Sequence, residues 1–205
     1  MGSVTVTSCE QQGKGKYKVC FDNGVECFLY RGEIRDYHIL PQADISEENY
    51  RLLLSETLSK RARKRAMHLL EQMDRSEMKL REKLNANGYP QECIDDAIDY
   101  VKSFHYLDDF RLACNFVRYQ CERLSRQQLI QKLLSKGISM EVVQQALETE
   151  YTAEESEQIQ ALLRKRKYEP ENCDEGEFRR TYSYLARRGF RSSDILKAMK
   201  KNEII

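Results

Sequence analysis

The sequence predicts a mainly α-helical protein with three tandem three-helix repeats in an elongated, curved array, preceded by a small N-terminal β-hairpin region and a leading helix. Three observations predict this fold class. A pattern centred on glycine recurs three times, residues typical of helix starts precede helical stretches, and β-branched and aromatic residues flank an Asn-Gly dipeptide near the N-terminus. A length of 205 residues suits an array of small repeats.

The composition excludes several classes of protein. With 9 Gly and 3 Pro, the chain is neither collagen-like nor a Pro/Gly-rich disordered protein, and no apolar run approaches the roughly 18–20 residues of a membrane-spanning helix. No signal-peptide pattern is visible. Seven cysteines without a C-x-x-C pair fit neither a disulfide framework nor a common zinc site. We expect a cytoplasmic protein with reduced thiols and no membrane partner.

Residues 1–38 are expected to form the β-hairpin region. Residues 4–7, 17–21 and 25–30 indicate strands, and Asn23-Gly24 favours a two-residue type I′ turn. That turn predicts a register with the pairs Phe21–Glu26, Cys20–Cys27, Val19–Phe28 and Tyr17–Tyr30, which puts Tyr17, Val19, Phe21, Phe28 and Tyr30 on one face. The two cysteines would then be either a redox bridge or, as a reducing compartment favours, two free thiols.

A leading helix is expected within residues 39–59. Ser46 is a good N-cap, Glu47 and Glu48 suit the first turn, and Ile45 and Tyr50 have the spacing of a hydrophobic staple. From this point on, nearly the whole chain has helical periodicity.

The main organising signal is the internal repeat, with expected units at 60–108, 109–157 and 158–205. Gly88, Gly137 and Gly189 are spaced by 49 and 52 residues, and each follows a leucine by four positions. Apolar residues recur six, nine and ten positions after each glycine, so they share one face of a following helix. A glycine that ends one helix in the left-handed conformation explains the pattern. The alternative is a globular bundle of nine or ten helices.

A further helix is expected to complete each unit, at Arg63–Met73, Phe110–Cys121 and Glu157–Lys167. Ser125 and Gln128 have capping-box spacing, and Asp174 with Glu177 could form another box. Each unit would therefore consist of three helices over about 50 residues, and the units would stack in a quasi-linear array in which each contacts its neighbours.

Three stretches carry a resemblance to the RecX family, regulators of the RecA recombinase. They are Arg75-Ser-Glu-Met-Lys-Leu-Arg-Glu-Lys-Leu84, then Tyr106-Leu-Asp-Asp109 with Phe110 and Ala113, and Leu129-Ile-Gln-Lys-Leu-Leu-Ser-Lys-Gly-Ile138. The repeats that resemble the family cover residues 60–205. Departures are Lys79 where the family usually has Glu, His105 where Gly is common, and Phe110 one place early.

The resemblance implies both the fold and the function. RecX-like proteins have three tandem three-helix repeats, bind in the helical groove of the RecA–DNA filament, and inhibit its ATPase, strand exchange and coprotease activities. We therefore expect a monomeric regulator whose partners are the RecA filament and, more weakly, single- and double-stranded DNA. The alternative function is a general DNA-binding helical-repeat protein that acts without RecA.

Local runs of charge dominate over the net charge of +1. Residues 60–65 contain five cations, residues 164–167 contain four, and residues 178–201 contain eight bases and one acid. Such runs either cover solvated helix surfaces or bind a polyanion, and their combination favours the second reading. The predicted binding residues are Lys60, Arg61, Arg63, Lys64, Arg65, Lys132, Lys136, Arg164, Lys165, Arg166, Lys167, Arg179, Arg180, Arg187, Arg188, Arg191, Lys197, Lys200 and Lys201.

Catalytic chemistry has little support in the sequence. His38, His68 and His105 are scattered, and no nucleophile, P-loop or metalloprotease motif occurs. Acids at 148–157 and at Asp108 and Asp109 could ligate a metal, but their positions at helix ends favour capping. We expect no catalytic residues, no cofactor, no metal and no enzyme activity.

Overall fold

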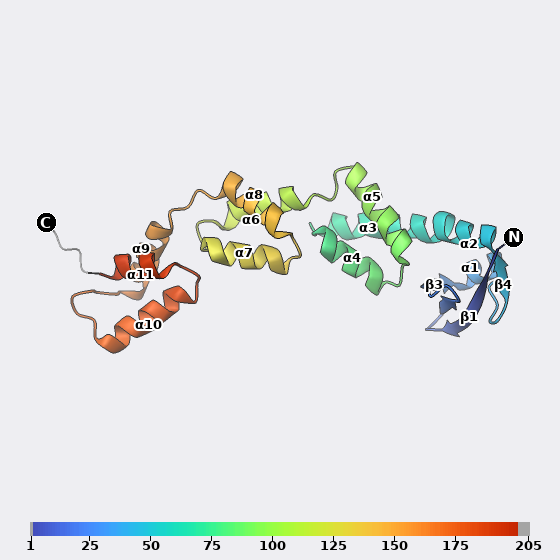
Figure 1. Cartoon of the computed structure of the whole chain (residues 1–205), viewed down its shortest axis with the longest axis horizontal. Helices are drawn as coiled ribbons and strands as arrows, with labels where there is room; N and C mark the ends of the chain where they lie inside the picture. The colour runs from blue at the N-terminus through green and yellow to red at the C-terminus, as the bar shows by residue number, and fades with distance from the viewer. Residues whose placement is uncertain (1, 201–205) are drawn as a thin grey trace. The chain divides into compact units, whose positions relative to one another are not determined.

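The computed structural model describes residues 2–200 (Figure 1). The chain divides into two compact units, Met1–Asp108 and Asp109–Ile205. In chain order, the first unit contains β1 (Ser3–Gln11), β2 (Lys16–Phe21), β3 (Glu26–Tyr30), α1 (Arg31–Asp36), β4 (Asp44–Ser46), α2 (Glu47–Leu52), a π-helical segment (Leu53–Ser59), α3 (Lys60–Gln72), α4 (Glu77–Ala86) and α5 (Gln91–Ser103).

The N-terminal region is a four-stranded antiparallel sheet in the order β3-β2-β1-β4. The predicted hairpin register is wrong by one residue, because Cys20 pairs with Glu26 and Val19 pairs with Cys27. The turn has three residues instead of two: the Phe21 amide donates to the Val25 carbonyl at 2.9 Å, and Gly24 takes a positive φ of 80°. The Asn23 side chain accepts from the Val25 amide, so it stabilises this longer loop.

The shift of one residue changes which side chains are buried. Val19, Phe21, Cys27 and Leu29 are buried, whereas Phe28 is half-buried and Tyr30 is exposed. The predicted face that combined Phe28 and Tyr30 with Val19 therefore does not exist. Cys20 and Cys27 are not opposite each other and both are free thiols, so the pairing that a redox bridge needed is absent.

The leading helix starts where the sequence predicts. Ser46 accepts a hydrogen bond from the Asn49 amide, and both Ile45 and Tyr50 are buried. The helical path then continues through the π-helical segment into α3 without a break. Neither α1 nor the short edge strand β4 was predicted, because each has too few residues for periodicity to reveal it.

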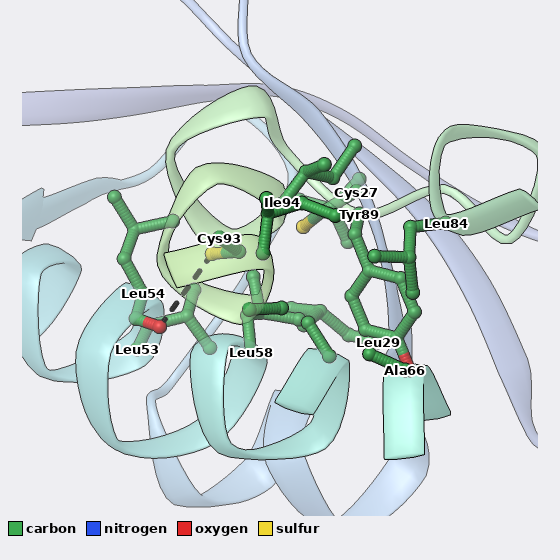
Figure 2. Close-up of a cluster of buried hydrophobic side chains, with 14 of the residues drawn as sticks. Cys27, Leu29, Leu53, Leu54, Leu58, Ala66, Leu84, Tyr89, Cys93 and Ile94 are labelled. Atoms are coloured by element: carbon green, nitrogen blue, oxygen red, sulfur yellow. Dashed lines mark hydrogen bonds between the residues drawn. The ribbon is translucent and has the colours of Figure 1, made fainter. Parts of the chain in front are cut away.

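One hydrophobic core joins the sheet to the helices of the first unit. Cys27 and Leu29 of β3 belong to the same buried cluster as Leu53, Leu54 and Leu58 of the π-helical segment. Figure 2 shows that Ala66, Leu84, Tyr89, Cys93 and Ile94 complete this cluster. The sheet is therefore an integral part of the first unit, because its removal would expose the faces of these helices.

The second unit contains α6 (Asp109–Gln120), α7 (Arg126–Ser135), α8 (Met140–Glu150), α9 (Glu155–Arg166), α10 (Glu175–Ala186) and α11 (Ser192–Met199). Helices α6–α8 and α9–α11 bury separate cores, one around Val117, Leu129 and Leu133, the other around Ile159, Leu185 and Ile195. The described residues thus form three separate cores. This differs from the alternative prediction of a globular bundle, which would have one common core.

The repeated glycines have the predicted role. Gly88, Gly137 and Gly189 take φ values of 78°, 83° and 83°, and each follows the end of a helix in which the leucine four positions before the glycine is fully buried. The apolar residue after Gly88 and Gly137 donates its amide back to the carbonyl of that leucine, as in a Schellman motif. Mostly helical three-helix repeats are therefore confirmed.

The elongated, curved arrangement and the repeat boundaries stay predictions. Helix α9 begins at Glu155, so the expected boundary between residues 157 and 158 falls inside a helix. Glu155 and Glu157 lie in the first turn of α9, where acidic side chains favour the positive end of the helix dipole. In the described part of the chain, no helix is long and apolar enough to cross a membrane.

Candidate functional site

The cations of α3 are largely used by the fold of the first unit. Arg61 donates to both carboxylate oxygens of Glu33 at 2.7 Å, and its guanidinium lies over the rings of Tyr30 and Tyr89. Burial alone would lower the pKa of Arg61, but the Glu33 carboxylate more than offsets this and raises it. Arg61 therefore ties α1 and β3 to α3.

Most of its neighbours in the same run also have internal partners. Arg63 forms a bidentate pair with Asp96 and lies over the Tyr100 ring, while Arg65 donates to the Asn87 side chain at 2.9 Å. Lys60 pairs with Glu56 one turn earlier at 2.5 Å. Among residues 2–200, Lys64 is the member of this run that is exposed without an ion pair. The run contributes less free positive charge than its sequence suggests.

The second repeat presents two of the predicted cations. Lys132 and Lys136 are exposed on and just after α7, and Lys136 lies 5.4 Å from the centre of the Phe116 ring. Helix α7 starts with the predicted capping box, in which the Ser125 side chain accepts from the Gln128 amide. Two lysines separated by one helical turn make a modest patch.

The third repeat, α9–α11, carries most of the unneutralised positive charge. Arg164, Lys165, Arg166 and Lys167 are exposed at the C-terminal end of α9, where cations complement the negative end of the helix dipole. Lys167 ends the helix in the left-handed conformation at φ 55°, and the Tyr168 amide donates back to the Leu163 carbonyl. This closure resembles that of the glycine turns but uses lysine.

The remaining predicted cations of this repeat lie on α10, on α11 and in the turn that joins them. Arg180, Arg187, Arg191, Lys197 and Lys200 are exposed, and Arg188 is half-buried. Arg179 pairs with Glu175, and within residues 2–200 this is the ion pair that forms in the third repeat. Both side chains of that pair are more than three-quarters exposed, so it neutralises little. Lys201 lies outside the described residues.

Two of these arginines share one aromatic ring. The guanidinium carbon of Arg166 lies 4.5 Å from the centre of the Tyr184 ring, and that of Arg188 lies 4.1 Å from it. Sequence reasoning missed this arrangement. Arg188 follows Tyr184 by four residues, just past the end of α10, and that spacing is a detectable signal, but the approach of Arg166 from α9 needs the tertiary structure.

The other aromatic residues near these cations serve the fold. Phe190 is buried beside Gly189, and the Tyr182 hydroxyl hydrogen-bonds the Ser192 side chain at 2.9 Å. Among the described residues, no group of three or more His, Cys, Asp or Glu side chains could hold a metal ion. The arrangement of the third repeat suits the binding of an extended anion.

Comparison with known proteins identifies the repeats. Three family models match the chain: the RecX first three-helix domain over residues 62–100, the second over 108–147 and the third over 153–199. A "Regulatory protein RecX" from Clostridium botulinum strain Eklund 17B is 23% identical over 207 residues, which covers 100% of this chain and 97% of the relative. One from Caldanaerobacter subterraneus is 29% identical over 158 residues and covers 76% and 78%.

Solved structures agree on the fold. A crystal structure of regulatory protein RecX matches with a TM-score of 0.63 and 21% identity, over 95% of this chain and 99% of that one. The crystal structure of RecX from Lactobacillus salivarius matches with a TM-score of 0.62 and 17% identity, over 72% and 98%. Since the three family models match in order and together cover more than half of the chain, the chain belongs to the RecX family of regulatory proteins.

Proposed function

We propose that this chain is a non-enzymatic regulator that binds the RecA–DNA filament and inhibits RecA ATPase, strand exchange and coprotease activity. Membership of the RecX regulatory family supports the partner. The observation that carries the proposal is the surplus of positive charge on the third repeat, where one ion pair forms among the described residues. A filament that contains DNA offers the polyanion that such a surface binds.

The interface that we propose is narrower than the set of cations in the sequence. It centres on the exposed cations of the third repeat, with Lys64, Lys132 and Lys136 as secondary contacts. Arg61 and Arg63 are excluded from it, because their carboxylate partners already satisfy them. We further propose that the chain acts as a cytoplasmic monomer, since all the cations of the proposed interface come from one copy of the chain.

The test is the DNA-dependent ATPase of RecA on single-stranded DNA, measured with and without the purified chain. The expected result is a fall in ATP turnover that depends on the ratio of this chain to RecA. A double variant, Arg187→Glu with Arg191→Glu, should inhibit less while keeping its helical circular dichroism. Turnover that stays unchanged at a micromolar excess of the chain would contradict the proposal.

The second candidate function is binding to DNA alone, favoured by cations whose exposure needs no filament. It also predicts lower ATP turnover, because a protein that coats DNA competes with RecA for it. Adding excess single-stranded DNA separates the two candidates. Inhibition that disappears with excess DNA supports the general DNA-binding function, whereas inhibition that persists supports contact with the filament.

A further inference from the structure

The ring of Tyr184 brings together two arginines from different parts of the third repeat. Arg166 is the last residue of α9, and Arg188 follows the end of α10 by two positions. Each guanidinium carbon lies within 4.5 Å of the ring centre, so the two carbons are at most about 9 Å apart. That separation is about one screening length at physiological salt, so the two charges repel each other.

The repulsion between these two arginines is not relieved by a carboxylate. In the part of the chain that the structure describes, neither Arg166 nor Arg188 forms a salt bridge, whereas Arg61 and Arg63 both do. The negative face of the Tyr184 ring attracts each guanidinium without removing its charge. The pair is therefore held in position and remains available to an anion.

The ring contact also leaves the hydrogen-bonding groups free. A guanidinium that stacks on a ring uses its face, and its N–H groups point outward from its edge in a fork that matches phosphate oxygens. Exposed Lys165, Lys167 and Arg187 are close in sequence to the pair and add further positive charge. A single carboxylate would neutralise one arginine, whereas a nucleic acid strand presents a row of phosphates to the whole group.

We propose that Arg166 and Arg188 bind phosphates of one nucleic acid strand and that Tyr184 is the positioning residue that holds the two guanidinia together. This deepens the proposed function by naming the contacts to the DNA of the filament, and it rests on that function only for the source of the DNA. The attraction of cations to helix C-termini explains why arginines occur at these two ends. It does not explain why both arginines lie on one ring. A variant without the ring therefore tests whether Tyr184 positions them.

The experiment measures the affinity of the full-length chain for a fluorescently labelled oligothymidine over a series of salt concentrations. Tyr184→Leu keeps every charge and an apolar side chain in the third core, but it removes the ring. We expect it to weaken binding by about fivefold, the combined effect of two exposed cation–π contacts. Tyr184→Phe keeps the ring and should bind within about twofold of the unchanged chain.

The arginines provide the matched comparison. Arg166→Gln with Arg188→Gln should lower the slope of log affinity against log salt by about 1.4, since each phosphate contact on a single strand contributes about 0.7. In that background, Tyr184→Leu should have no further effect, because the ring then has no guanidinium to position. Arg164→Gln is the charge-matched comparison: it removes one exposed cation of the same helix that has no cation–π contact with the ring, so Tyr184→Leu should keep its effect of about fivefold in that background.

The outcomes separate this inference from the proposed function. If Tyr184→Leu and Tyr184→Phe bind DNA equally well, the ring does not position the arginines and the inference fails, whatever happens to RecA. Equal competition by polyglutamate at the same ionic strength would assign the pair to acidic protein surfaces and would also overturn it. If the unchanged chain does not inhibit RecA but Tyr184→Leu still weakens the binding of oligothymidine, the proposed function fails and the inference stands. If Tyr184→Leu lowers helicity, the arginine double variant still decides, because an unchanged salt slope in that variant would show that Arg166 and Arg188 do not bind phosphates and would overturn the inference.

Discussion

The cations of α3 and those of the third repeat both form basic runs in the sequence, but the two sets differ in their partners. Arg61 and Arg63 are paired with Glu33 and Asp96, which lie 28 and 33 residues away along the chain. Arg166 and Arg188 lie instead on an aromatic ring. The comparison teaches that a basic run predicts a binding surface only where the tertiary structure brings no carboxylate to it.

The reason for the difference lies in what each helix packs against. Helix α3 packs against α5, and its Arg61 reaches Glu33 of α1, so acids from two other elements pair with its arginines. In the third repeat, Arg166 and Arg188 lie at the C-terminal ends of α9 and α10, past the buried residues of those helices. Helix ends face solvent, and their dipoles favour cations without a partner side chain.

The largest effect is expected from breaking the pair of Arg61. Arg61→Gln leaves the Glu33 carboxylate without its partner, and both side chains are about one-fifth exposed in the pair. We expect the free energy of unfolding to fall by about 2–3 kcal/mol, less than for a fully buried pair. Urea unfolding measures it. Lys64→Gln, on the same helix and exposed, should change stability by less than about 0.5 kcal/mol; equal effects would contradict a structural role for Arg61.

The next largest effect is the loss of stability expected from alanine substitutions at the glycine turns of the two units. A Cβ on Gly88 would lie 2.0 Å from the Phe28 ring, and one on Gly189 would lie 2.7 Å from the Gln127 Cβ. Both also have positive φ, so we expect Gly88→Ala and Gly189→Ala to cost about 2 kcal/mol of stability. Gly24→Ala is the control, since Gly24 has φ 80° but no atom within 4 Å of its Cβ position. It isolates the conformational cost of about 1 kcal/mol, and thermal unfolding compares the three variants.

A smaller effect concerns acid pH. Burial tends to raise the pKa of Glu77, but Lys102 and Arg81 outweigh it and hold that pKa below the usual 4.5; Arg81 likewise lowers the pKa of Asp95. These carboxyl groups bind protons more readily in the unfolded chain, so their stabilisation is present above pH 4.5 and is lost as the pH falls below it. Thermal unfolding between neutral pH and pH 3 should show the loss, and Glu77→Gln should reduce its pH dependence. If Glu77→Gln has the same pH dependence of stability as the unchanged chain, the Glu77 carboxyl group is not a source of the loss.

The repeats were predictable because their signal is redundant. Each glycine, the leucine before it and the apolar residues after it satisfy one geometry, and the same pattern occurs three times. The hairpin register had no such redundancy. Asn23-Gly24 is compatible with two- and three-residue loops, and one hydrogen bond from the Val25 amide to the Asn23 side-chain oxygen favours the longer loop.

The interface was only partly predictable, because pairing between distant side chains is not visible in a linear run. Nothing near residues 60–65 in the sequence indicates that Glu33 and Asp96 reach Arg61 and Arg63. His105 illustrates a different case. It takes φ 57°, which favours glycine, so the residue that departs from the family pattern still adopts the backbone conformation that glycine would provide there.

The most direct test removes the same number of exposed charges from each region and compares the affinity for labelled single-stranded DNA across salt concentrations. Lys60→Gln with Lys64→Gln neutralises two cations of α3, and Arg187→Gln with Arg191→Gln neutralises two of the third repeat. We predict that the third-repeat variant loses about 1.4 in the slope of log affinity against log salt, while the α3 variant loses at most about 0.7, the share of the secondary contact Lys64, because Lys60 is paired with Glu56. Equal losses, or a larger loss from α3, would contradict the assignment of the binding surface to the third repeat.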